Sequence, residues 1–123
     1  MIITRLYNDE KGESHFTDIE VEIFDSGNIG KLSEKFPVNE IIFREPSGDY
    51  KYDFHNAPQR QFIILLEGEI QIETSLGEVR NFKAGEVLLV EDTEGKGHKT
   101  KSVDGNLRRS IFVTLGDNDA KIE

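Results

Sequence analysis

Two histidines and one glutamine are the side chains of this sequence best suited to act on a bound molecule. His55 lies just before the apolar run that begins at Gln61, and His98 follows a second apolar run through a turn that ends in Gly-Lys-Gly. Each histidine stands at the edge of a predicted β segment, so both reach one cavity if the two segments pack together. Because side chains alternate between the faces of a strand, Gln61 shares a face with Ile63 and Leu65 and can point into that cavity.

Three further residues are candidates for the wall of this cavity. Tyr52 and Phe112 are predicted to help line a mostly apolar pocket with a few convergent polar groups, which is the usual form of a small-molecule site. Arg44 follows an apolar run and is suited to bind a carboxylate through two parallel hydrogen bonds. The alternative for Arg44 is an ion pair with Glu45 or another surface acid.

Short strands separated by turn residues are predicted to position these side chains. The predicted strands cover residues 18–24, 40–45, 50–55, 61–66, 69–73, 78–82, 86–90, 99–103 and 108–115. Asp104-Gly105 predicts a hairpin turn. The best helical candidate, residues 30–36, is stopped by Pro37 and gives at most one or two turns. The chain is therefore predicted to be all-β, with the turn frequency of a sandwich or barrel.

The region around His55 resembles the first motif of the cupin superfamily. His55 stands at the first histidine of the His-x-His pair, Gln61 at the glutamate and Gly68 at the final glycine. Ala57 occupies the place of the second histidine.

The region around His98 resembles the second cupin motif. Gly85 opens it, Gly95 stands at its internal glycine and His98 at its histidine. Thr93 and Ser102 replace the usual proline and asparagine, and the spacing from Gly85 to Thr93 is longer than usual. The amino-acid sequence of both regions is similar to that of a group of small bacterial cupins.

This resemblance implies an all-β double-stranded β-helix, the jelly-roll cupin barrel. Residues 1–123 would form a single domain, with the motifs in residues 49–115 and N-terminal strands in residues 1–45 completing the sheets. It also implies a degenerate site for one divalent metal ion (Fe, Mn, Ni or Zn) held by His55, Gln61 and His98. The neutral amide of Gln61 lacks the charge of a glutamate, so metal affinity is expected to be low. The alternative is no metal, with the two histidines hydrogen-bonded inside the barrel mouth.

The charge of the chain restricts its partners. Its 123 residues suit one domain, and its formal net charge of -9 disfavours binding to nucleic acid or to anionic membrane surfaces. Lys96, Lys99 and Lys101 lie around His98 and either draw an anionic ligand to the mouth or form a solvated rim. The absence of Cys fits a reducing compartment, and the polar residues soon after the N-terminus do not read as a signal peptide, so we expect a cytoplasmic protein.

The leading hypothesis is a protein that binds a small organic molecule, which the lysines suggest is anionic. A metal-dependent enzyme of the oxygenase or isomerase/epimerase type is the alternative, and a sensor or structural module is a third. We also expect a homodimer formed through edge strands, with residues 2–6 and 18–24 as the contact.

Overall fold

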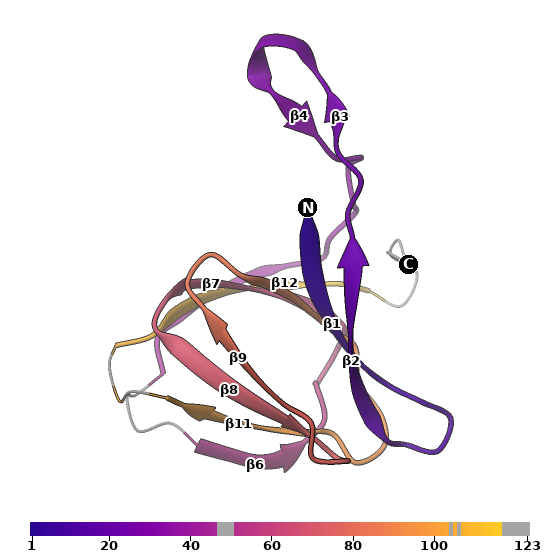
Figure 1. Ribbon diagram of the computed structural model, residues 1–123, viewed down its shortest axis with the longest axis vertical. Helices are drawn as coiled ribbons and strands as arrows, with labels where there is room; N and C mark the ends of the chain where they lie inside the picture. The colour runs from indigo at the N-terminus through magenta and orange to yellow at the C-terminus, as the bar shows by residue number, and fades with distance from the viewer. Residues whose placement is uncertain (47–50, 104, 106, 117–123) are drawn as a thin grey trace.

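The computed structural model describes residues 1–46, 51–103, 105 and 107–116, which form twelve strands and one short 3₁₀ helix (Figure 1). The elements are β1 (Ile2–Asn8), β2 (Ser14–Glu20), β3 (Phe24–Asp25), η1 (Gly27–Ile29), β4 (Lys31–Leu32), β5 (Ile41–Arg44), β6 (Lys51–His55), β7 (Gln61–Glu67), β8 (Glu69–Thr74), β9 (Val79–Lys83), β10 (Val87–Val90), β11 (His98–Ser102) and β12 (Arg109–Thr114). The eight strands predicted after residue 39 are confirmed to within one residue at either end. The predicted turn at Asp104-Gly105 lies partly outside the described residues.

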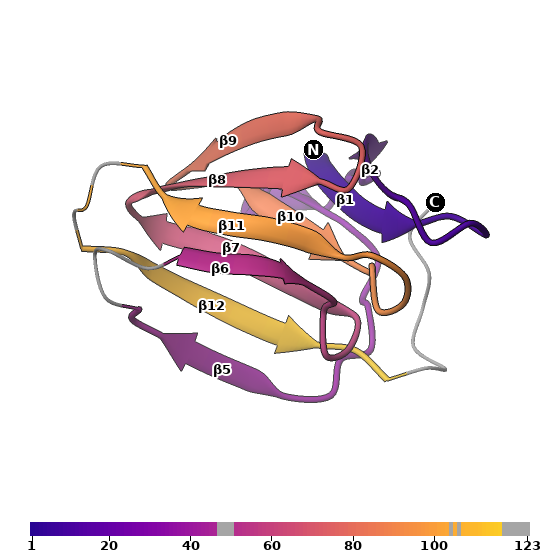
Figure 2. The same ribbon diagram turned by 90° about the horizontal axis from the view of Figure 1, so that it is seen from below.

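Strands β5 to β12 have the order of a jelly roll. One sheet has the order β2-β1-β10-β7-β12-β5 and the other has the order β6-β11-β8-β9 (Figure 2). The facing quartets β10-β7-β12-β5 and β6-β11-β8-β9 are the two halves of an eight-stranded double Greek key. The predicted all-β jelly roll is confirmed. Strands β5 to β12 pair within two separate sheets, however, so the unit is a sandwich and the closed barrel is not confirmed.

The first strand is internal to its sheet. β1 pairs with β2 in antiparallel fashion along its whole length, and with β10 in parallel fashion from Thr4 to Leu6. From Thr4 to Leu6 both of its backbone edges are therefore occupied, and the prediction that residues 2–6 form an edge strand is wrong. The edges of this sheet are β2 and β5.

The segment between β2 and β5 differs from its prediction. The strand expected at residues 18–24 begins earlier, at Ser14, because β2 pairs with β1 from the Ser14–Asn8 pair onward. Residues 30–36, the best helical candidate of the sequence, form no helical turn in this described segment, which instead forms β4 after η1. Gly30 has a φ of 94° and a ψ of -149°, a conformation that only glycine adopts readily, and its carbonyl accepts a hydrogen bond from Ser26 N. This turn folds the chain into the small β3–β4 hairpin.

Alternation along the strands divides the apolar residues between two clusters. The main cluster lies between the two sheets and consists of Leu6, Phe16, Ala57, Leu65, Ile70, Ile72, Phe82, Leu88 and Val90. A second cluster of Ile3, Ile19, Leu89 and Leu115 lies on the other face of the six-stranded sheet. The central sheet therefore has apolar residues on both faces.

The turn before β11 packs tightly against the end of β6. The carbonyl of Gly97 accepts a hydrogen bond from Ser14 Oγ at 2.8 Å. A Cβ added at Gly97 would lie 2.1 Å from the backbone oxygen of His55, and the φ of Gly97 is +72°. Only a residue without a side chain allows this approach, which brings His98 beside His55.

We predict that Gly97→Ala destabilises the fold more than Gly77→Ala does. Both glycines have a positive φ, but a Cβ at Gly77 would meet nothing within 4 Å. Left-handed strain of about 1–2 kcal/mol is common to both variants, and the clash adds about 1–3 kcal/mol at Gly97. Urea unfolding measures the difference, and equal free energies of unfolding for the two variants would contradict the close contact.

Candidate ligand-binding site

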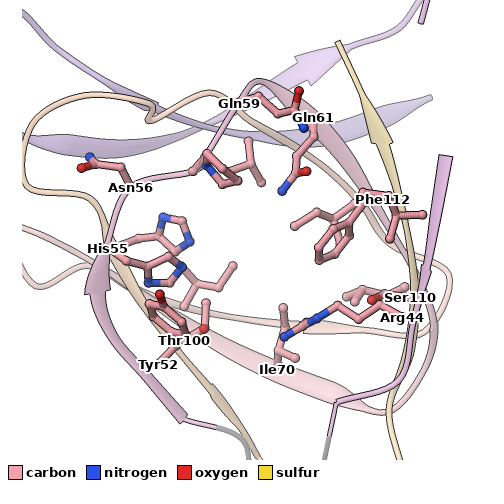
Figure 3. Close-up of a pocket in the computed structure, with 18 of the residues that line it drawn as sticks. Arg44, Tyr52, His55, Asn56, Gln59, Gln61, Ile70, Thr100, Ser110 and Phe112 are labelled. Atoms are coloured by element: carbon pink, nitrogen blue, oxygen red, sulfur yellow. The ribbon is translucent and has the colours of Figure 1, made fainter. Parts of the chain in front are cut away.

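A pocket of about 460 Å³ lies between the two sheets (Figure 3). The structure brings all six predicted site residues to its lining: Arg44, Tyr52, His55, Gln61, His98 and Phe112. They come from β5, β6, β7, β11 and β12, so strands of both sheets contribute. Val90, which follows Leu88 on the inner face of β10, also lines the pocket. The roles of the six residues in binding stay a prediction.

The two histidines lie side by side at the mouth. His55 ends β6 and His98 begins β11, the two are paired in register, and their ring centroids are 4.6 Å apart. His55 Nδ1 donates to the carbonyl oxygen of Asp53 at 2.8 Å, and His98 Nδ1 contacts Asp92 Oδ2 at 2.5 Å. In each ring the Nδ1 atom is engaged within the protein, which leaves Nε2 to interact with a molecule in the pocket.

Asp92 is a site residue that the sequence analysis missed. It is fully buried, and its hydrogen bond to His98 compensates for part of the cost of removing its carboxylate from water, through Oδ2, while Oδ1 has no hydrogen-bond partner among the described residues. The Asp92 backbone carbonyl also accepts hydrogen bonds from Ala57 N at 3.2 Å and Asn56 Nδ2 at 3.3 Å. Asp92 is one of three acids in the polar segment 91–97, and nothing in the sequence distinguishes it as the buried one.

The arginines form the other polar part of the lining. Arg44 lies with its guanidinium 5.3 Å from the centre of the Phe112 ring and points into the pocket in Figure 3. Arg108 also lines the pocket and is only 3% exposed, and the sequence analysis did not single it out. Side-chain alternation could have predicted this position. Arg108, Ser110 and Phe112 occupy successive positions on one face, so Arg108 faces the pocket as Phe112 does.

Gln61 and Arg60 point to opposite faces, as alternation predicts. Gln61 is 6% exposed, and its amide points into the pocket in Figure 3. Arg60 instead contacts Glu91 Oε2 at 2.6 Å, and Glu91 Oε1 contacts Arg5 Nε at 2.6 Å. This double ion pair joins β1 to the start of β7 on the outer side.

The donor set of the pocket fits a metal ion only weakly. Two imidazoles with free Nε2 atoms and the neutral amide of Gln61 are the ligands present, so there is no negative charge among them. No group of three His, Cys, Asp or Glu side chains suited to a metal occurs within the described part of the chain. A divalent ion would be held by His55, His98 and Gln61, with water completing its coordination.

The lining carries the positive charge of two arginines in an acidic protein. Among the described lining residues there are two arginines and two histidines, and none is acidic. Asp92, just behind the wall, is already bonded to His98. The predicted lysines do not line the pocket: Lys96 pairs with Glu13, and Lys99 lies over the Phe54 ring. The pocket is therefore suited to an anion.

Comparisons with known proteins establish no family. No protein-family model matches the sequence, and no curated protein matches it. Among solved structures, the chain is similar to protein NMB1881 from Neisseria meningitidis, at 14% identity over 67% of this chain and 84% of that one, with a TM-score of 0.49. It is also similar to a cupin-2 domain containing protein from Shewanella frigidimarina, at 18% identity over 67% and 80% of the two chains, with a TM-score of 0.47. A putative ethanolamine utilization protein Q from Salmonella typhimurium matches at 15% identity over 96% and 98%, with a TM-score of 0.44.

At these levels of similarity, the jelly-roll assignment rests on the strand order of the chain itself. Among the residues that the structure describes, no helix is long and apolar enough to cross a membrane.

We predict that His55 makes the fold less stable as the pH falls from 7 toward 5. Burial of the ring is the main cause that lowers the pKa of His55 below its ordinary value of 6.5. The charges of His98 and Arg44 act in the same direction, whereas the bond to Asp53 and the charge of Asp92 oppose it. The unfolded chain then binds a proton at His55 more readily than the folded chain does, so stability is lost as the pH falls through 6.5.

The His55→Phe variant measures this contribution. Chemical unfolding of the wild type and the variant at pH 7 and pH 5 gives the difference between the two pH dependences. We expect a shallower loss of stability in the variant. A loss as steep as in the wild type would mean that His55 titrates alike in the folded and unfolded states.

Proposed function

We propose that this chain is a cupin-like protein that binds a small organic anion between its two sheets. The observation that carries the proposal is the charge of the pocket. In a chain of net charge -9, the described lining residues include the charged side chains of Arg44 and Arg108 but no acid. The jelly-roll strand order and the positions of His55 and His98 support the cupin resemblance.

The pocket offers separate groups for the two parts of such a ligand. The guanidinium of Arg44 can bind a carboxylate with two parallel hydrogen bonds. The Nε2 atoms of His55 and His98 can hydrogen-bond a second polar group. Apolar lining side chains such as Ile42 and Ile63 would contact the hydrocarbon part of the ligand. A volume of about 460 Å³ suits a small organic acid.

The charge and composition of the chain also bear on its location and partners. An acidic surface gives no attraction to nucleic acid or anionic lipid, so we propose that the partner is a small molecule. The absence of Cys is compatible with action in the cytoplasm.

We predict that small carboxylates bind and that Arg44→Met weakens them. The probes are succinate and benzoate, and succinamide and benzamide are their uncharged counterparts. Loss of a charge-assisted hydrogen bond costs about 1.5–3 kcal/mol, so affinity should fall by roughly tenfold or more in the variant. Isothermal titration calorimetry at low ionic strength measures the dissociation constants.

The matched control is Arg109→Met. Arg109 points away from the pocket and contacts Glu67 Oε1 at 3.2 Å, so its loss should leave carboxylate affinity unchanged. Amides that bind as tightly as the acids, or an Arg109 variant as impaired as the Arg44 variant, would reject the anion site. So would the absence of any carboxylate binding.

A metal-dependent enzyme is the second candidate function. Both histidines have Nδ1 hydrogen-bonded to a protein oxygen, which is the outer-shell arrangement common to metal-ligating histidines. A bound divalent ion would act as a Lewis acid toward an oxygen of the substrate. The protein residues would orient that substrate, with Arg44 and Phe112 on the opposite wall.

We predict that Gln61→Glu strengthens the binding of Zn²⁺ or Ni²⁺. The substitution places a negative charge beside the two imidazoles, where the wild type has a neutral amide. Gln59→Glu is the control. Gln59 also lines the pocket, so this substitution introduces the same charge at another point of the lining. Titration calorimetry in chelator-treated protein should show tighter binding for Gln61→Glu than for Gln59→Glu. Equal affinities would remove Gln61 from the ligand set.

A further inference from the structure

The hydrogen bonds of the two pocket histidines determine which kind of group each ring can bind. The Nδ1 atom of His55 lies 2.8 Å from the backbone carbonyl oxygen of Asp53. A carbonyl oxygen can only accept a hydrogen bond, so Nδ1 of His55 carries the proton. A neutral imidazole has a single N–H group, and Nε2 of His55 is therefore a hydrogen-bond acceptor. Burial lowers the pKa of His55 and so favours the neutral ring.

The neutral ring of His98 has its proton at the same place. Its Nδ1 atom lies 2.5 Å from Oδ2 of Asp92, and the fully buried carboxylate accepts the hydrogen bond. Nε2 of His98 then carries a lone pair as well. Among the described residues, no protein group donates a hydrogen bond to either Nε2 atom. Both rings line the pocket and His98 is only 5% exposed, so the two acceptors meet the pocket rather than bulk water.

The other side of the pocket carries hydrogen-bond donors. In Figure 3 Arg44 enters from the side opposite His55, and a guanidinium group has donors but no acceptor. Arg44 on β5 is paired in register with Ser110 on β12. Ser110 is 3% exposed, and its hydroxyl has no hydrogen-bond partner among the described residues, so it can donate to an anion held by Arg44. Donors and acceptors are thus separated within one pocket.

Most of the remaining lining is apolar. Ile63 and Leu65 of β7, Ile72 of β8 and Val90 of β10 line the pocket and offer no side-chain hydrogen bond. A ligand that reaches both polar sides therefore needs a hydrocarbon part between its two polar groups.

The charge of the lining excludes one class of donor at the histidines. An ammonium group also donates hydrogen bonds, but no described lining residue is acidic, whereas Arg44 and Arg108 are positively charged. The carboxylate behind the wall, Asp92, is already bonded to His98. A cation in this pocket would lose its hydration without an anionic partner, which is strongly unfavourable. The donor that meets the histidines must therefore be uncharged, and a hydroxyl group satisfies this condition.

We propose that the ligand is a hydroxy acid with a hydrocarbon spacer, bound with its carboxylate at Arg44 and with its hydroxyl donating to Nε2 of His55. This inference rests on the proposed anion-binding function and adds the class and the orientation of the ligand. Its distinguishing element is the direction of one hydrogen bond, because the histidine accepts and the ligand donates. Nε2 of His98 is a second acceptor beside the first, since the two ring centroids are 4.6 Å apart.

Four carboxylates of equal chain length test this ligand class. They are hexanoate and its derivatives with a terminal hydroxyl, methoxy or ammonium group, and the corresponding butyrate and octanoate sets cover other spacer lengths. Isothermal titration calorimetry of chelator-treated protein gives the dissociation constants. One uncharged hydrogen bond changes affinity by about two- to tenfold. In the best-fitting set, the hydroxy acid should bind at least about threefold more tightly than each of the other three acids.

Replacement of single histidines locates the preference for the hydroxyl. In His55→Phe, the ratio of the affinities for the hydroxy acid and the unsubstituted acid should fall at least about threefold. His15→Phe is the matched control, because His15 lies on β2, bonds to Asp9 and does not line the pocket. It should keep the wild-type ratio. A ratio that is unchanged in His55→Phe would overturn the proposal.

Nitrogen NMR of the imidazole rings measures the proton positions in the wild type without any ligand. At about pH 8, above the ordinary histidine pKa, we expect Nδ1 to be protonated and Nε2 to be unprotonated in His55 and His98. A proton on Nε2 of His55 would overturn the proposal, even if His55→Phe does not fold. Carboxylates that bind with no preference for the hydroxyl over the methoxy group would overturn this inference alone. If none of the carboxylates binds, the proposed anion-binding function fails as well.

Discussion

The hydrogen bond between Asp92 and His98 is the interaction on which the pocket depends. A carboxylate with no exposed surface is strongly unfavourable unless a hydrogen-bonding partner compensates for its lost hydration. His98 provides that partner at 2.5 Å, and the bond determines which ring nitrogen faces the pocket. The backbone of Asp92 in turn holds Asn56 and Ala57, so three separate segments at the mouth are connected through one residue. A ligand therefore meets a preformed wall rather than a set of loose loops.

Strand alternation connects this pocket to the opposite surface of the molecule. On β5, Ile42 and Arg44 face the pocket while Ile41 and Phe43 face outward, and the same division holds along β7 and β12. β5 has one strand neighbour, β12, and is the edge of its sheet. β5 therefore carries pocket residues on one face and exposed apolar residues on the other.

Local patterns predicted most of the fold and much of the site. Period-two alternation and turn residues located every strand after residue 39, because each is a property of neighbouring residues. The same parity correctly separated Gln61 from Arg60. The same alternation, followed from Phe112 back through Ser110, would also have identified Arg108 as a pocket residue.

Features that depend on distant contacts were not predictable in this way. The burial of Asp92 arises from packing against a histidine on another strand, and its neighbours in sequence are polar. β1 was taken for an edge because its partner β10 lies far along the chain. Residues 30–36 were a candidate for one or two helical turns on their side-chain pattern, and the backbone conformation of Gly30 reverses the chain there instead.

The parallel pairing of β1 with β10 has a consequence for how the protein is made. Thr4 pairs with Leu88, so the contact spans most of the chain and raises the contact order of the fold. The β1–β2 hairpin emerges from the ribosome before β10, with Ile3 and Leu6 uncovered. At about 5–20 residues per second, β10, which pairs with the open edge of β1, follows only several seconds later. Nascent chains of this protein thus pass through an interval in which an apolar hairpin has an open edge, and a chaperone has its clearest opportunity to bind.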